Sequence, residues 1–168
     1  MTGAIFYASK YGSTEQYAHW IADEVNIPVF DVDRDSVEPS DYDFAVIAAP
    51  VIYHKLMFHK WARRHAADLL NRPTFLVSVS GAGPGAKLDG WIAASLPPDL
   101  VAHAEHFALR GRQNPRDLNL YDRVMLQIGG LMNRDPQARR DEMKGFDYMD
   151  KASVAPVIER IGHLQRAH

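Results

Sequence analysis

The chain has 168 residues, of which 46% are hydrophobic and 24% charged, a composition typical of one globular domain spanning residues 1–168. Its formal net charge of −2 gives no reason to expect a nucleic-acid partner, and the lack of cysteine excludes disulfides, zinc thiolate sites and thiol chemistry. No basic stretch followed by an apolar run begins the sequence, and no segment approaches the roughly 20 apolar residues that span a bilayer. A cytoplasmic protein is therefore expected, with peripheral membrane contact left open.

Apolar runs of strand length alternate with amphipathic segments of helical period along the whole sequence. Pro50 is expected to end the third strand, and Asn71 and Pro73 are expected to end the helix that follows it. Polar runs at 33–41 and 133–145 separate the other elements. The predicted elements in chain order are strand 3–8, helix 13–25, strand 27–32, strand 42–50, helix 58–69, strand 73–80, helix 91–96, strand 101–111, helix 120–132 and helix 153–166.

This alternation predicts an α/β fold in which a five-stranded parallel sheet is doubly wound, with helices on both faces. In such a sheet a ligand lies beyond the carboxyl ends of the strands, near the point where the strand order reverses. The loops that follow strands 3–8, 42–50 and 73–80 are therefore the predicted ligand-binding loops.

The first of these loops, SKYGST (residues 9–14), carries three hydroxyls around one glycine. A helix start has unpaired backbone N–H groups and partial positive charge, both of which attract phosphate. A glycine at this place lets the backbone approach an anion closely. The alternative is that Ser13 only caps the helix and Gly12 only makes the turn. Phosphate binding is favoured because the three hydroxyls directly follow the first strand.

Three other phosphate-handling patterns are excluded. The nucleotide-hydrolase P-loop, G-x-x-x-x-G-K-[ST], is absent from this loop. The dinucleotide fingerprint, G-x-G-x-x-G, does not follow the first strand, and the glycine-rich run 81–85 follows the fourth strand instead. A phosphoacceptor receiver domain needs acidic residues after the first and third strands, where this chain has Ala8-Ser9 and Ala49-Pro50.

The SKYGST loop resembles the phosphate loop of the flavodoxin superfamily, which receives the phosphate of flavin mononucleotide (FMN). Within that superfamily, YASKYGSTEQYAHWIADEV and residues 42–81 are similar to the branch that contains the menaquinone-dependent protoporphyrinogen oxidases. Residues 107–111 and 120–130, with Tyr121-Asp122-Arg123, extend this similarity more weakly. The resemblance implies a flavodoxin-like fold with FMN as the cofactor.

The resemblance also implies which residues surround the cofactor. The phosphate would be held by Ser9, Lys10, Tyr11, Gly12, Ser13 and Thr14. The isoalloxazine ring would lie along Pro50, Val51, Ile52, Tyr53 and His54. The ring edge would face backbone groups of Ser80, Gly81, Ala82 and Gly83. Since the glycine-rich loop has no aromatic residue before Trp91, Tyr53 would cover one face of the ring and the other face would be open to a substrate.

The implied activity is that of an FMN-dependent oxidoreductase of the protoporphyrinogen oxidase-like type, which passes electrons between an organic substrate and a quinone or another acceptor. Because the cofactor supplies the chemistry, no residue is expected to be a catalytic acid or base. Lys10, Lys55 and Lys87 lie on the three predicted loops and favour a less negative flavin potential than that of an electron carrier. The alternatives are a non-enzymatic electron carrier that docks a redox protein, and a flavodoxin-like binding module that has lost FMN. A homodimer is left open.

The predicted helix 120–132 carries an apolar stripe of Leu120, Val124, Ile128 and Leu131. Such a stripe is expected to pack on the sheet. The alternative is contact with a quinone or a membrane surface, because several arginines lie nearby. These are Arg123, Arg134, Arg139 and Arg140.

Three histidines, a residue type that ligates metals, lie in the middle of the chain. His59 and His65 are six residues apart, which does not place them on one helical face, and His54 precedes the helix. No metal site is therefore expected.

Overall fold

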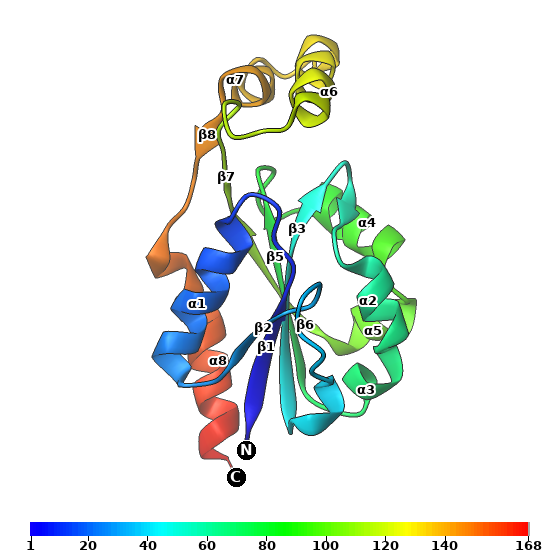
Figure 1. Cartoon of the computed structure of the whole chain (residues 1–168), viewed down its shortest axis with the longest axis vertical. Helices are drawn as coiled ribbons and strands as arrows, with labels where there is room; N and C mark the ends of the chain where they lie inside the picture. Colours follow the sequence, from blue (N-terminus) through cyan, green and yellow to red (C-terminus); the bar gives the residue numbers. More distant parts are fainter. Residues whose placement is uncertain (168) are drawn as a thin grey trace.

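Five parallel strands form the central sheet of the computed structural model, which describes residues 1–167. Their bounds are β1 Gly3–Tyr7, β2 Val29–Asp31, β3 Phe44–Ile52, β5 Thr74–Ser80 and β6 Glu105–Arg110. The sheet order is β2-β1-β3-β5-β6, and the short β4 (Lys55–Leu56) pairs antiparallel with the end of β3. The parallel strands alone follow the order 2-1-3-4-5, so the predicted doubly wound, flavodoxin-like fold is confirmed (Figure 1).

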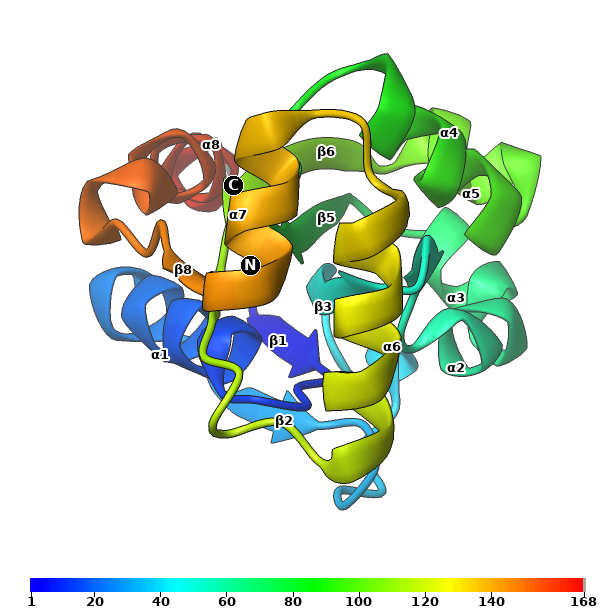
Figure 2. The same ribbon diagram turned by 90° about the horizontal axis from the view of Figure 1, so that it is seen from above.

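Helices cover both faces of the sheet, as Figures 1 and 2 show. One face is covered by α1 (Ser13–Val25) and α8 (Ala155–Arg166). The other face is covered by α2 (His59–Arg64), α3 (Ala66–Leu70), α4 (Ala86–Ser95) and α5 (Pro98–His103). Short 3-10 turns, η1 (Pro39–Asp41) and η2 (Lys151–Val154), precede β3 and α8.

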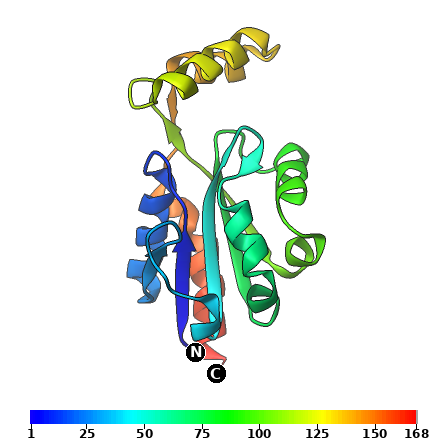
Figure 3. The same ribbon diagram turned by 45° about the vertical axis from the view of Figure 1, so that its right-hand side comes forward.

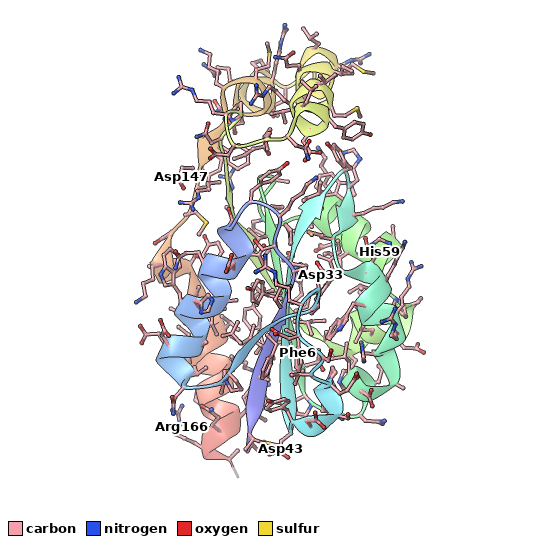
Figure 4. The ribbon with its side chains drawn as sticks, in the orientation of Figure 1. Phe6, Asp33, Asp43, His59, Asp147 and Arg166 are labelled. Atoms are coloured by element: carbon pink, nitrogen blue, oxygen red, sulfur yellow. The ribbon has the colours of Figure 1, made fainter. Side chains whose placement is uncertain are left out.

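Two apolar cores lie on the two faces of the sheet, because successive side chains of a strand point to opposite faces. In β1, Ile5 and Tyr7 belong to the core that includes Ile161 of α8, whereas Ala4 and Phe6 belong to the core that includes Leu88 of α4. Phe6 is labelled near the middle of the sheet in Figure 4. A strand that is buried on both faces appears in the sequence as a continuous apolar run, which explains why these strands can be recognised.

A helical hairpin (residues 114–145) stands above the carboxyl ends of the strands, as Figures 1 and 3 show. It consists of α6 (Leu120–Met132) and α7 (Pro136–Lys144). A two-stranded antiparallel ribbon of β7 (Arg112–Gln113) and β8 (Phe146–Asp147) connects it to the sheet. Figure 4 labels Asp147 in this ribbon, between the hairpin and the body of the molecule.

The prediction of a strand over 101–111 is wrong in its first half. Residues Pro98–His103 form α5, and β6 begins only at Glu105. Pro98 occupies the first turn of α5, where the missing N–H of proline has no helical partner to lose. Because α5 is short and buries Leu100 completely, its apolar content resembles that of a strand.

The polar run 133–145 is not a loop, because it contains α7. Asp135 caps this helix by accepting a hydrogen bond of 2.9 Å from the N–H of Gln137, and Pro136 occupies its first turn. Most described side chains of α7 are exposed, so no apolar stripe marks it in the sequence. The sequence carries one sign of this helix, the pair Asp135-Pro136, because Asp often caps a helix and Pro often occupies its first turn.

Three other boundaries differ from the predictions. The helix predicted at 91–96 begins at Ala86, the helix predicted at 58–69 is interrupted at His65, and the strand predicted to end at Pro50 continues to Ile52. The apolar stripe of α6 does not pack on the sheet, since Leu120, Val124, Ile128 and Leu131 are all exposed. That expectation is wrong. No described helix is both long and apolar enough to cross a bilayer.

Gly3 shows how tightly the core fixes the first strand. A Cβ atom at this position would lie 2.0 Å from the fully buried ring of Phe44. We expect Gly3→Ala to lower the free energy of unfolding by about 1–3 kcal/mol in urea denaturation, the usual range for overpacking. The control is Gly90→Ala in α4, where a Cβ would meet no atom within 4 Å. It should stabilise the protein by about 0.5–1 kcal/mol through the helix propensity of alanine; equal losses in both variants would contradict this packing.

Candidate functional site

A cavity of about 80 Å³ lies at the carboxyl ends of β1, β3 and β5. Its lining residues are Ser9, Lys10, Tyr11, Ser13, Thr14, Pro50, Val51, Ile52, Val79, Ser80, Gly81, Gly111, Arg112, Gln113 and Phe146. A larger hollow of about 500 Å³ adjoins it, and the two share Tyr11, Arg112, Gln113 and Phe146. The three predicted ligand-binding loops therefore meet at one place.

The SKYGST loop leaves the start of α1 without a side-chain cap. Gly12 precedes the helix in the left-handed region, at φ 90°, and its N–H donates a hydrogen bond of 3.1 Å to Ser9 Oγ. The Ser13 hydroxyl donates to the Arg112 carbonyl at 3.3 Å and accepts from the Arg112 N–H at 3.2 Å. Ser13 thus ties the loop to β7 and does not cap α1. The first-turn N–H groups of α1 therefore have no side-chain cap, which is the arrangement that attracts an anion.

Two buried hydroxyls in this cavity have no hydrogen-bond partner within the described part of the chain. They are Thr14 Oγ1, on a residue that is 1% exposed, and Ser80 Oγ, on a residue that is 6% exposed. Buried polar atoms almost always have a partner, so two orphaned hydroxyls on residues that line one cavity indicate that a polar group binds beside them. Together with the uncapped helix start, the Thr14 hydroxyl fits a phosphate group, and the Ser80 hydroxyl fits another polar part of a ligand.

Pro50 lies inside β3 rather than at its end. The ladder between β1 and β3 ends at the pair Tyr7 and Ala48, so Pro50 lies beyond the last residue of β1 in the ladder. Its missing N–H therefore breaks no pairing with β1, and its carbonyl accepts a hydrogen bond of 3.0 Å from Met57. The strand can continue to Ile52 for this reason.

Tyr53 and His54 form the two-residue turn between β3 and β4. Both have positive φ, 50° and 62°, as a type I′ hairpin turn requires and as side-chain-bearing residues rarely adopt. The Tyr53 hydroxyl donates to Asp122, and the His54 ring stacks on Trp91 with centroids 4.7 Å apart. Strained turns of this kind occur often at functional sites.

Asp122 of α6 joins the hairpin to two of the predicted loops. It is 6% exposed, forms an ion pair with Lys10, and accepts hydrogen bonds from the hydroxyls of Tyr11 and Tyr53. Burial alone would raise the pKa of Asp122, but the hydrogen bonds from Lys10, Tyr11 and Tyr53 outweigh it and lower the pKa from 3.8 to about 2. The hydrogen bond to Asp122 also raises the pKa of Lys10, so both partners are charged at neutral pH.

The β7–β8 ribbon lines one part of the cavity, which the sequence did not reveal. The ring of Phe146 lies against Gly81, where a Cβ atom would be only 2.6 Å from it. Arg110 donates a hydrogen bond of 2.7 Å to the Gly81 carbonyl and lies 3.5 Å from the Tyr148 ring centroid. The glycine at 81 is therefore needed for the close approach of an aromatic side chain from far along the chain.

Ten of the fifteen predicted site residues line the cavity. The other five, Gly12, Tyr53, His54, Ala82 and Gly83, lie on the same three loops but outside the lining. Contact with FMN stays a prediction for all fifteen residues. Sequence reasoning missed five lining residues, Val79, Gly111, Arg112, Gln113 and Phe146. Val79 could have been found as the inward residue next to Ser80, whereas no local signal marks Phe146.

A separate cluster lies beside η1, away from this cavity. The Nδ1 atom of His65 is 3.0 Å from Glu38 Oε2, and one ligand atom from each of Glu38, His65 and Asp68 lies within 4.8 Å of the others. The sequence spacing did not reveal this cluster, because Glu38 comes from a different element. The closest contact within this cluster is the one between His65 and Glu38.

A family model described as a flavodoxin domain matches residues 4–141. No curated protein matches the chain at a significant level. A Fusobacterium nucleatum flavodoxin bound to FMN is 14% identical with a TM-score of 0.45, and the match covers 67% of this chain and 71% of that chain. A WrbA-like protein from Agrobacterium tumefaciens is 13% identical with a TM-score of 0.47, covering 95% and 98% of the two chains. The Trp repressor binding protein from Bacillus subtilis is 15% identical, also with a TM-score of 0.47, covering 84% and 95%.

Proposed function

The chain belongs to the flavodoxin domain family, and on this basis we propose that it is an FMN-dependent oxidoreductase. Family membership supports FMN, the cofactor that the sequence predicts. The observation that carries the proposal is the pair of orphaned hydroxyls, Thr14 Oγ1 and Ser80 Oγ, beside an uncapped helix start. When bound, FMN supplies one- and two-electron transfer, and the protein supplies position and electrostatics.

The phosphate is proposed to bind at residues 9–14. The backbone N–H groups that open α1 would donate to it, and the Thr14 hydroxyl would gain the partner that it lacks. Ser80, at the end of β5, also lines this cavity, and its hydroxyl likewise lacks a partner. The hydrogen bonds between Ser13 and Arg112 fix the position of the loop that would receive the anion.

The larger hollow favours an enzyme over an electron carrier. Its volume of about 500 Å³ is within the range of roughly 300–1,000 Å³ that small-molecule sites occupy. It lies under the start of the helical hairpin, lined by Asn114, Asp117 and Leu118 among others. An organic substrate could be held there, and the sequence similarity to protoporphyrinogen oxidases suggests a porphyrinogen as the substrate and a quinone as the acceptor.

Arg112 is the cation best placed to influence the flavin potential. The sequence assigned this role to Lys10, Lys55 and Lys87, but Lys10 is paired with Asp122 and Lys87 lies over the ring of Trp91. Arg112 lines both hollows, and reduction adds negative charge to a flavin.

We expect Arg112→Gln to make the potential of bound flavin more negative by roughly 20–30 mV for a two-electron couple, as expected for one solvated charge. Anaerobic redox titration of the FMN-loaded protein measures this shift. Lys55→Gln, which replaces an exposed lysine of β4, is the control and should change the potential by less than half as much. A larger shift in the Lys55 variant than in the Arg112 variant would count against this assignment.

The proposed activity is tested by purifying the protein, identifying any released flavin, and assaying oxidation of protoporphyrinogen with a water-soluble menaquinone analogue. Copurified FMN and quinone-dependent turnover are expected. Bound FMN without turnover would assign the protein to the electron carriers. Absence of flavin binding even with added FMN would assign it to binding modules that have lost the cofactor.

A further inference from the structure

Phe146 lies where the cavity and the larger hollow meet. It is the first residue of β8, next to Asp147, which Figure 4 labels, and it lines both spaces. Tyr11, Arg112 and Gln113 also line both, and each of these three side chains carries a polar group. Of the described residues at this boundary, only Phe146 has an entirely apolar side chain. Ligand sites combine such apolar surfaces with a few polar groups.

The ring of Phe146 is held in place by Tyr148. Side chains two residues apart on an extended backbone point to the same side, and these two rings stack with centroids 5.1 Å apart and planes 25° apart. The Arg110 guanidinium lies 3.5 Å from the Tyr148 ring centroid, and the Tyr148 hydroxyl donates a hydrogen bond of 2.6 Å to Asp141 of α7. Tyr148 therefore covers one face of Phe146 and fixes the position of its ring.

Phe146 also places an aromatic ring beside the glycine-rich loop (residues 81–85), which has none of its own. Its Cζ atom would be the nearest atom to a Cβ at Gly81, at 2.6 Å, so the tip of the ring rests on the backbone of this loop. Trp91, the next aromatic residue in the sequence, lies outside the lining of the cavity. Since Tyr53 follows β3 and Gly81 follows β5, the two loops each have an aromatic side chain beside them.

We propose that Phe146 packs against the isoalloxazine ring of FMN on the side of the glycine-rich loop. This inference rests on the proposed binding of FMN, which places the isoalloxazine between residues 50–54 and 80–83. Flat aromatic rings attract each other in offset-stacked or edge-to-face arrangements. Phe146 covers this side of the flavin, as Tyr53 is predicted to cover the other, so the side that the sequence left open is closed. A substrate in the larger hollow approaches the flavin next to Phe146.

The alternative role of Phe146 is to anchor the β7–β8 ribbon on the body of the protein. The contact with Gly81 serves this role, but it uses only the tip of the ring. The ring is half-buried, unlike a core side chain, and it lines two spaces. A leucine at this position keeps an apolar anchor for the ribbon but has no flat face for stacking. Phe146→Leu therefore separates the two roles.

Titration of FMN into the full chain, followed by the absorbance change of the flavin, tests the proposal. We expect Phe146→Leu to raise the Kd for FMN roughly 3- to 10-fold, the range that corresponds to one lost aromatic pair. Phe107→Leu is the matched control, because Phe107 is also half-buried but lies outside the lining of the cavity. It should change the Kd less than about twofold. Circular dichroism and thermal unfolding establish that both variants are folded.

NMR of the FMN complex reports the contact itself. In protein labelled at phenylalanine, Phe146→Leu identifies the Phe146 ring signals by removing them, and nuclear Overhauser effects from these ring protons to the isoalloxazine are expected in the wild type. A role limited to the ribbon would produce none. FMN binding without these Overhauser effects, or with the same Kd in Phe146→Leu, would overturn the inference and leave the proposed function standing. Failure of the wild type to bind FMN would overturn both.

Discussion

Thr14→Val should strengthen the folding of the flavin-free protein and weaken the binding of FMN. The Thr14 hydroxyl is buried without a partner, so replacing it with a methyl group of similar size removes an unmet polar group. The free energy of unfolding should rise by about 1 kcal/mol. The same change removes a donor to the phosphate, and a hydrogen bond to a charged group contributes about 1.5–3 kcal/mol. We therefore expect the Kd for FMN to rise roughly 10- to 100-fold.

Urea denaturation without flavin and fluorescence titration with FMN measure the two effects. Thr14→Ser is the matched control, because it keeps the hydroxyl and should keep most of the affinity. Ser80→Ala tests the second orphaned hydroxyl in the same way. Destabilisation of the flavin-free protein by Thr14→Val, with unchanged FMN affinity, would mean that the hydroxyl serves the fold and not a ligand.

Asp122→Asn should release the helical hairpin from the body of the protein. Asp122 forms an ion pair with Lys10 and accepts hydrogen bonds from Tyr11 and Tyr53. An asparagine has no charge and only one acceptor oxygen, so it keeps only some of these interactions. Since the pKa of Asp122 is lowered from 3.8 to about 2, its ionised form stabilises the fold at every pH above its unfolded value. This shift corresponds to about 2 kcal/mol, which is lost as the pH falls from about 4 to about 2.

Urea denaturation across that pH range, and at neutral pH, compares the free energy of unfolding of the wild type with that of Asp122→Asn. At neutral pH the wild type should be about 2 kcal/mol more stable than Asp122→Asn, and the difference should vanish near pH 2. Faster amide hydrogen exchange in residues 114–145 should accompany the loss. Asp117→Asn, a substitution of an exposed acid on the same hairpin, is the control and should change neither quantity. A difference between wild type and Asp122→Asn that does not change with pH would exclude the charge as its cause.

Much of the fold could be predicted because its signals are local. The strands β1, β3 and β5 are buried on both faces and appear as apolar runs, and α1 shows a clear helical period. The SKYGST loop lies between the apolar run of β1 and the helical pattern of α1. Its place at the carboxyl end of β1 therefore follows from the alternation of strands and helices. The same reasoning brought the loops after β3 and β5 to the same cavity.

The rest depends on contacts between distant segments. Phe146 reaches Gly81 only because the β7–β8 ribbon folds back over the sheet, and nothing around Phe146 marks it. The α7 helix lacks an apolar stripe because most of its described side chains are exposed. The stripe on α6 was correctly placed on a helix but assigned to the core, since periodicity reveals an apolar face and not what covers it.

The proposed binding of FMN at the first strand-to-helix junction is tested most directly by titrating FMN into ¹⁵N-labelled protein and following the backbone amide signals by NMR. The signals of Gly12, Ser13 and Thr14 should shift with saturable dependence on FMN, and riboflavin, which lacks the phosphate, should leave them nearly unchanged. FMN binding that shifts amides elsewhere while these three stay in place would contradict a phosphate site at the start of α1.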